Sequence, residues 1–136
     1  MNEVYVAGVS MADVGWHELD PHELGARVCA EALRDARLLP REVEGIASTP
    51  HGYMAENRKF ASQRMADYLG VTAAFMMDVD SGGNSSAAAV HAAYERIRSG
   101  KIRSCLVFAA QREVPKKVIQ RDVFSYFHLI MSANSL

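Results

Sequence analysis

Short apolar runs alternate with helix-like segments along this 136-residue chain, and this alternation constrains the fold more than any other feature. Apolar runs of roughly six residues are typical of buried strands, whereas apolar residues three and four apart are typical of amphipathic helices. Strands and helices in alternation form a parallel sheet with right-handed crossovers and a helical cover. We therefore predict an α/β fold with a mostly parallel sheet.

Four strands and three helices are expected before residue 112. The strands are predicted at 4–9, 43–49, 75–79 and 105–110, and the helices at about 21–37, 60–69 and 84–99. The first strand is predicted to be buried because both of its faces are apolar. Beyond residue 112 the regular pattern fails, no closing strand is expected, and the chain looks cut.

Two of the helices carry informative ends or surfaces. The first begins with Asp20 as N-cap, Pro21 at the first position and Glu23 at the third, which together favour a helix start. The third contains an alanine-rich stretch at 87–93, which lets other backbones approach closely. We therefore predict that this third helix is buried at the centre of the domain.

The charge pattern excludes several classes of function. The formal net charge is −1 and the signs are interspersed, so the chain lacks the basic patch of a nucleic-acid-binding protein. It contains no apolar stretch near the roughly 18 residues that cross a bilayer, and a cytoplasmic location is expected. The two cysteines, Cys29 and Cys105, have no metal-ligand spacing and are expected to be reduced core thiols.

The small-residue turn at 81–86 is the strongest candidate site. It follows a predicted strand and opens the alanine-rich helix, with Asn84 or Ser85 as the candidate cap. Ligands of parallel α/β sheets gather at the carboxyl ends of strands, where helix N-termini offer free N–H groups. The position therefore favours chemistry or binding.

Three interpretations of the turn stay open on the residues alone. A phosphate-binding turn lacks the required glycine spacing and lysine. A nucleophile elbow would use Ser81, Ser85 or Ser86, but the G-x-S-x-G pattern and a neighbouring base are missing. The third interpretation is a purely structural turn into a closely packed helix.

Several segments, in their order and spacing, resemble the N-terminal half of a thiolase-superfamily protein. The resemblance covers about 1–112 and is greatest to the cysteine-lacking branch related to sterol-carrier-protein-X thiolases and steroid side-chain aldolases. It rests on VAGVSM at 6–11, AEALRDA at 30–36, VEGI at 43–46, DYLG at 67–70, IRSGK at 97–101 and CLV at 105–107. The implied fold is a layered thiolase-like half-domain over 1–112, followed at 113–136 by the start of a covering-loop region.

The resemblance also implies that the nucleophile is missing. Matching Val79 and Asp80 to the valine-asparagine pair of working thiolases puts Gly83 where their catalytic cysteine lies. The implied substrate-binding residues are Gly83, Asn84 and Ser85, with backbone N–H groups of Gly83 and Asn84 stabilising an oxyanion, and also His128, in the covering-loop region. The catalytic acid and base are not carried over, because the family supplies them from its later half.

The implied activity is retro-aldol cleavage of a steroid or lipid side chain on a coenzyme A thioester, without a metal or redox cofactor. The implied partners are a second copy, paired through the strand at 75–79, and an OB-fold protein or a chain that carries the later half. The alternative is a non-catalytic subunit of a lipid-binding or CoA-binding complex. His51, His91 and Tyr126 are weaker candidates for the site.

Overall fold

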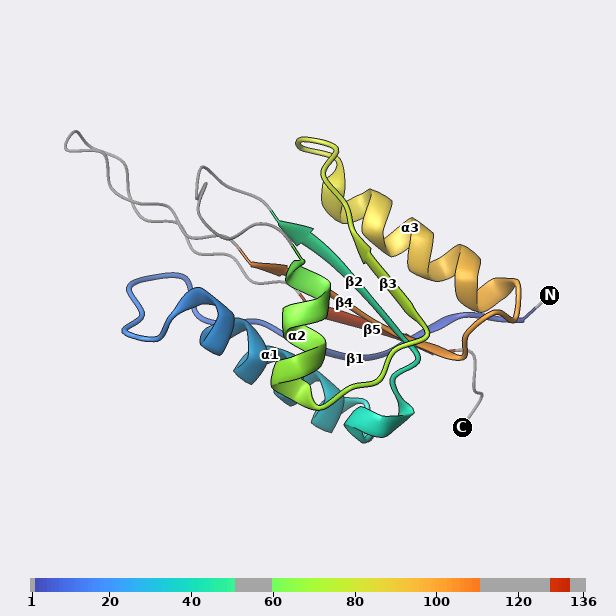
Figure 1. Cartoon of the computed structure of the whole chain (residues 1–136), viewed down its shortest axis with the longest axis horizontal. Coiled ribbons are helices and arrows are strands. Elements are labelled where there is room, and N and C mark those ends of the chain that lie inside the picture. Colours follow the sequence, from blue (N-terminus) through green and yellow to red (C-terminus); the bar gives the residue numbers. More distant parts are fainter. Residues whose placement is uncertain (1, 51–59, 111–127, 133–136) are drawn as a thin grey trace.

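A five-stranded sheet forms the centre of the molecule, for which a computed structural model describes residues 2–50, 60–110 and 128–132 (Figure 1). In spatial order the strands are β1 (Tyr5–Ser10), β5 (His128–Ser132), β4 (Ser104–Ala110), β2 (Gly45–Pro50) and β3 (Phe75–Asp78). β2 is parallel to both β3 and β4, whereas β5 is antiparallel to β1 and β4. Four of the five strands therefore run in one direction, and the predicted mostly parallel α/β fold is confirmed.

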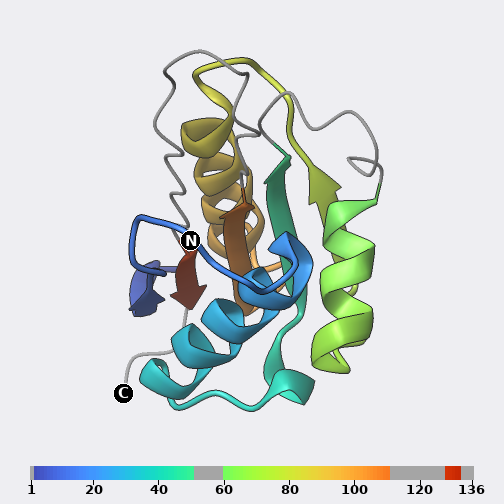
Figure 2. The same ribbon diagram turned by 90° about the vertical axis from the view of Figure 1, so that its left-hand side faces the viewer.

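Helices cover both faces of this sheet (Figures 1 and 2). α1 (Pro21–Asp35) and α2 (Ala61–Leu69) pack on one face, and α3 (Ser85–Arg98) packs on the other; a short 3-10 helix, η1 (Pro40–Glu42), precedes β2. Side chains alternate between the faces of a strand, so Ile46 of β2 joins the α1 and α2 core while Ala47 joins the α3 core. None of the helices in the described ranges has the length and apolar character needed to cross a membrane.

The helix ends follow their sequence signals closely. The Asp20 carboxylate accepts a hydrogen bond from the His22 N–H (2.8 Å), and the Glu23 carboxylate accepts one from the Asp20 N–H (3.4 Å). The predicted capping box is therefore confirmed. α1 ends two residues earlier than predicted, because Arg37 takes a left-handed φ of 55°, whereas α2 ends as expected at Gly70 with a φ of 65°.

β1 is an edge strand, so the prediction that it is buried is wrong. The side chains of Tyr5, Val6 and Val9 are 46%, 54% and 50% exposed. Only Gly8 is fully buried, because α1 packs against it so closely that an added Cβ would lie 2.6 Å from the Ala32 carbonyl oxygen. Within the described residues, α1 is the helix that covers this strand, and it covers one face.

β5 was not expected, and its presence corrects the prediction that no strand follows residue 112. It lies between β1 and β4, with His128 opposite Ser10 on one side and Phe108 on the other. Its five residues are too few for a periodic signal, and antiparallel pairing between distant segments is set by the whole sheet. The division of the chain at residue 112 stays a prediction.

α3 is buried along one face only. Ser85, Ala89, Ala93 and Ile97 face the sheet and are buried, whereas Ser86, Ala87, His91 and Glu95 are exposed. A helix on a sheet buries the side that touches the strands, and a second layer is needed to cover the other. The predicted burial of this helix is therefore confirmed only for the face toward the sheet.

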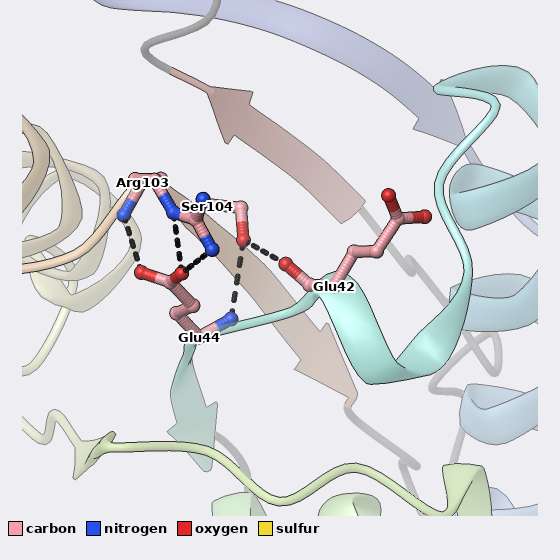
Figure 3. A network of polar contacts seen from close by, with 4 residues as sticks. All are labelled: Glu42, Glu44, Arg103 and Ser104. Atoms are coloured by element: carbon pink, nitrogen blue, oxygen red, sulfur yellow. Dashed lines mark hydrogen bonds and ion pairs between the residues drawn. The ribbon is translucent and has the colours of Figure 1, made fainter.

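Polar contacts join the amino ends of β2 and β4 (Figure 3). Glu44 accepts hydrogen bonds from the Arg103 backbone N–H (2.8 Å) and Nε (2.6 Å), and the two side chains form an ion pair. The Ser104 hydroxyl accepts from the Glu44 N–H (3.1 Å) and donates to the Glu42 carbonyl (2.5 Å). The hydrogen bonds from Arg103 hold the pKa of the Glu44 carboxyl below its usual value.

Candidate active site at the carboxyl edge of the sheet

The turn between β3 and α3 lies at the carboxyl edge of the parallel strands, with residues 80–84 exposed (Figure 1). Ser85 begins α3 and is fully buried. Its hydroxyl accepts a hydrogen bond from the Ser81 N–H (2.7 Å) and donates one to the Gly82 carbonyl (2.8 Å). The hydroxyl that was predicted to bind substrate is thus engaged in holding the shape of the turn.

Asn84 is the N-cap residue of α3, but its side chain makes no capping hydrogen bond. Its N–H donates to the Ser81 carbonyl over 3.4 Å, and the Ser85 N–H donates to the Gly82 carbonyl over 3.2 Å. Of the two N–H groups predicted to stabilise an oxyanion, the Asn84 donor therefore points into the turn. The Gly83 N–H has no backbone acceptor among the described residues.

The backbone requires glycine at only one of the two glycine positions in the turn. Gly82 has a φ of 59°, a left-handed conformation that costs about 1–2 kcal/mol for a residue with a side chain. Gly83 is not left-handed, and a Cβ added there would meet no atom within 4 Å. Neither backbone nor packing requires glycine at position 83, so the absence of a side chain there leaves open space at the start of α3.

Two hydroxyl residues near the end of β2 were missed by the sequence analysis. The Ser48 hydroxyl donates to the Asp78 carboxylate (2.5 Å), which also accepts from the Ser62 N–H (2.9 Å) at the start of α2. Thr49 is 1% exposed, and its hydroxyl oxygen has no hydrogen-bond partner among the described residues. Leaving a buried hydroxyl unpaired costs about 1–3 kcal/mol. The available signal was the pair of polar residues that ends an otherwise apolar strand.

The histidines predicted for the site are not all brought to it. The backbone of His128 lies at the same edge of the sheet as the turn, with β4 and β2 between them. His91 is exposed on α3, and its ring stacks against Tyr94 with 6.4 Å between the ring centroids. His51 and Tyr126 lie outside the described residues.

Both cysteines are free and buried, as predicted for core thiols. Burial raises the pKa of the Cys29 thiol well above its usual value and that of Cys105 to about 12. A nucleophilic cysteine needs a lowered pKa and access to substrate, so neither thiol has the properties of a nucleophilic cysteine. Within the described ranges, no group of three or more His, Cys, Asp or Glu side chains could hold a metal ion.

The chain was compared with protein families and solved structures. Residues 11–122 match the β-ketoacyl synthase, N-terminal domain family. Curated protein sequences give no match. This family match covers the turn between β3 and α3.

Three solved structures share the fold. The priming β-ketosynthase of the R1128 polyketide biosynthetic pathway is 15% identical, with a TM-score of 0.79 over 99% of this chain and 51% of its own. OleA from Xanthomonas campestris with bound lauric acid and lauroyl-CoA is 14% identical, with a TM-score of 0.73 over 98% of this chain and 57% of its own. The Ltp2-ChsH2(DUF35) aldolase is 19% identical, with a TM-score of 0.70 over 86% of this chain and 30% of its own.

At these identities the structural matches establish the fold, and the thiolase-like α/β fold predicted from the sequence is confirmed. The chain spans about half the length, 51% and 57%, of the first two of these structures. The specific branch predicted for it is not decided by these matches. The family match extends over most of the chain, so this protein belongs to the β-ketoacyl synthase N-terminal domain family and has a thiolase-like fold.

Proposed function

We propose that this chain forms the thioester-binding half of a lyase that cleaves a carbon–carbon bond in an acyl-CoA without a covalent acyl-cysteine. The observation that carries the proposal is Gly83. It occupies the position matched to the nucleophile, at the start of α3, and the space beside it is open. A ligand can therefore approach the helix N-terminus where a cysteine side chain would otherwise stand.

The reaction that fits this turn is a retro-aldol cleavage of a β-hydroxyacyl thioester. A base removes the proton of the β-hydroxyl group, the Cα–Cβ bond breaks, and its electron pair forms an enolate on the thioester. Cβ leaves as a ketone or aldehyde, and protonation of Cα releases the shortened acyl-CoA. The Gly83 N–H and the positive end of the α3 dipole would stabilise the enolate oxygen, with one well-placed donor contributing on the order of 3 kcal/mol.

The relatives support this choice of substrate and reaction. One structure with this fold holds lauroyl-CoA, and another is an aldolase in complex with a DUF35 partner. We extend to this chain a coenzyme A thioester substrate, with a steroid or lipid side chain as the acyl group, and an OB-fold partner protein. We assign the acid and base to no residue of this chain, and we propose a cytoplasmic location.

The free edge of β3 supports a homodimer. Among the described strands β3 pairs only with β2, and its Met76 and Met77 side chains are 38% and 40% exposed. An edge strand presents unpaired N–H and carbonyl groups that a second strand can bind. We propose that two copies pair through the segment 75–79.

The test begins with the natively expressed protein and every chain that co-purifies with it, identified by intact mass. This assembly is expected to convert a β-hydroxyacyl-CoA into a shortened acyl-CoA and a carbonyl product, both measured by chromatography. In the same assembly, Gly83→Cys is expected to gain a covalent acyl adduct, visible by mass, whereas the control Gly83→Ala is not. Absence of turnover by the complete assembly would rule out the lyase.

A non-catalytic subunit is the second candidate, because we assign neither the acid nor the base to a residue of this chain. Both cysteines are buried with raised pKa values, so neither would supply a base in their place. Such a subunit would contribute a dimer surface and part of a lipid or CoA pocket to a companion chain. It predicts binding of acyl-CoA by the assembly and unchanged turnover when Gly83 is replaced by alanine.

A further inference from the structure

The hydroxyl of Thr49 is a buried polar group that has no hydrogen-bond partner in the part of the chain that the structure describes. Its neighbours in the sheet do have partners, since Ser48 binds Asp78 through its side chain and accepts the Val79 N–H at its carbonyl (2.8 Å). A buried hydroxyl of this kind in a native structure needs an explanation. The position of Thr49 provides one.

Thr49 lies on the face of the sheet that α3 covers. Ala47, two residues earlier on β2, packs in one cluster with Ala89 of α3 and with Val79. Alternation puts Thr49 on the same face, whereas Ser48 faces α2. The Thr49 hydroxyl therefore points to the side of the sheet on which α3 begins.

The first turn of α3 lies above this hydroxyl. α3 begins at the carboxyl edge and runs back along the sheet (Figure 1). Two strand residues from Ala47 to Thr49 advance about 6–7 Å toward that edge, and four helix residues from Ala89 back to Ser85 advance about 6 Å. Thr49 is thus placed beneath Ser85, next to the turn that contains Gly83.

Solvent exposure increases along β4 beside Thr49. On β4, Val107 is buried, but Ala109, the residue opposite Thr49 on the same face, is partly exposed. The residues of the turn, 80–84, are exposed as well. Thr49 itself is 1% exposed, so its hydroxyl lies just inside the packed core, behind the exposed residues that border the open space at Gly83.

We propose that Thr49 is a specificity-determining residue of this site, with its hydroxyl binding an oxygen atom on the acyl chain near the thioester. This inference rests on the proposed function. The neighbours Ala47, Val79 and Ala109 are apolar, which favours a neutral hydroxyl or carbonyl oxygen over a charged group. Thr49 thus selects 3-hydroxyacyl or 3-oxoacyl thioesters over saturated ones.

The experiment uses the natively purified assembly and two ligands that differ by one oxygen atom, 3-hydroxydecanoyl-CoA and decanoyl-CoA. Binding of each ligand is measured by calorimetry, and chromatography of the same samples measures cleavage of the 3-hydroxy ligand, so that the heat of reaction is subtracted from the heat of binding. A site built to bind a substrate hydroxyl discriminates against the analogue that lacks it. The wild-type protein is expected to bind the 3-hydroxy ligand about tenfold more tightly.

Two variants separate binding from structure. Thr49→Val keeps the side-chain shape without the hydroxyl, so it is expected to remove the tenfold preference. Because the hydroxyl has no partner in the free protein, this variant should melt at the same or a higher temperature. Thr49→Ser keeps the hydroxyl and should keep the preference.

The outcomes are distinguishable. If wild-type protein binds both ligands equally, or Thr49→Val retains the preference, the role of Thr49 is overturned while the proposed function stands. A clearly lower melting temperature of Thr49→Val without ligand would show a structural role and overturn the inference. If the wild-type assembly binds neither thioester, the proposed function fails and the inference fails with it.

Discussion

The two edges of the sheet differ in how completely their polar groups are paired. At the amino edge, Glu44, Arg103 and Ser104 bind one another and the neighbouring backbone, and Gly45 is enclosed by side chains. At the carboxyl edge Ser48 and Ser85 are also hydrogen-bonded, but the Thr49 hydroxyl has no partner among the described residues and Gly83 faces open space. In parallel α/β sheets ligands bind at the carboxyl edge, so one edge of this sheet stabilises the fold while the other remains available for binding.

Alanine substitution of one glycine at each edge should give the largest difference in stability between the two edges. At Gly45 a Cβ would lie 2.8 Å from Ile102 Cδ1 and 3.1 Å from Cys105 Sγ, so Gly45→Ala should lower the free energy of unfolding by about 1–3 kcal/mol. At Gly83 there is no such contact, and Gly83→Ala should leave stability unchanged or raise it by up to about 1 kcal/mol. Urea unfolding measures both, and equal losses would contradict the comparison.

Removal of a hydroxyl at each edge should give a smaller difference. Ser104→Ala leaves the Glu44 N–H and the Glu42 carbonyl without their partner, so the free energy of unfolding should fall by about 1 kcal/mol. Ser86→Ala, at an exposed position in the first turn of α3, is the matched control and should change stability by less than about 0.5 kcal/mol. A stability loss at Ser86 as large as at Ser104 would show that the two hydrogen bonds of Ser104 contribute no more than an exposed hydroxyl.

Acid should weaken the contact between Glu44 and Arg103 at the amino edge. The pKa of the Glu44 carboxyl is lowered in the folded state by its hydrogen bonds to Arg103. Its contribution to stability is therefore present above the carboxyl pKa of the unfolded chain and is lost as pH falls through the lower folded value. The effect should be small, because the Arg103 side chain is 72% exposed.

The measurement compares wild type with Glu44→Gln by urea unfolding at several pH values. The stability difference between them is expected to shrink as the pH falls below about 4. A difference that stays constant with pH would mean that the carboxylate charge contributes nothing at this edge.

Local signals predicted the helix starts and ends well, and distant pairing less well. The capping box at Asp20 and the left-handed Gly70 depend on neighbouring residues, and both were predicted correctly. Exposure of β1 and the existence of β5 depend on which segments meet in the sheet, which no local pattern reports. β2 begins two residues later than predicted, because Pro40 opens a 3-10 turn before it.

The candidate site was predicted in place but not in detail. Strand, glycines and helix located the turn at 81–86, and matching to a known family singled out Gly83. The engagement of the Ser85 hydroxyl and the absence of a partner for Thr49 follow from the conformation of the turn and the packing of α3. Neither can be derived from residue spacing alone.

The insertion of β5 between β1 and β4 also dictates an order of assembly. Among the described strands β1 pairs with residues 128–132, more than a hundred residues later in the chain, whereas β2 pairs directly with both β3 and β4. During synthesis the three-stranded centre can form first, while β1 completes its pairing only after residues 128–132 have been made. Until then the nascent chain exposes the unpaired backbone N–H and carbonyl groups of β1 and of one edge of β4.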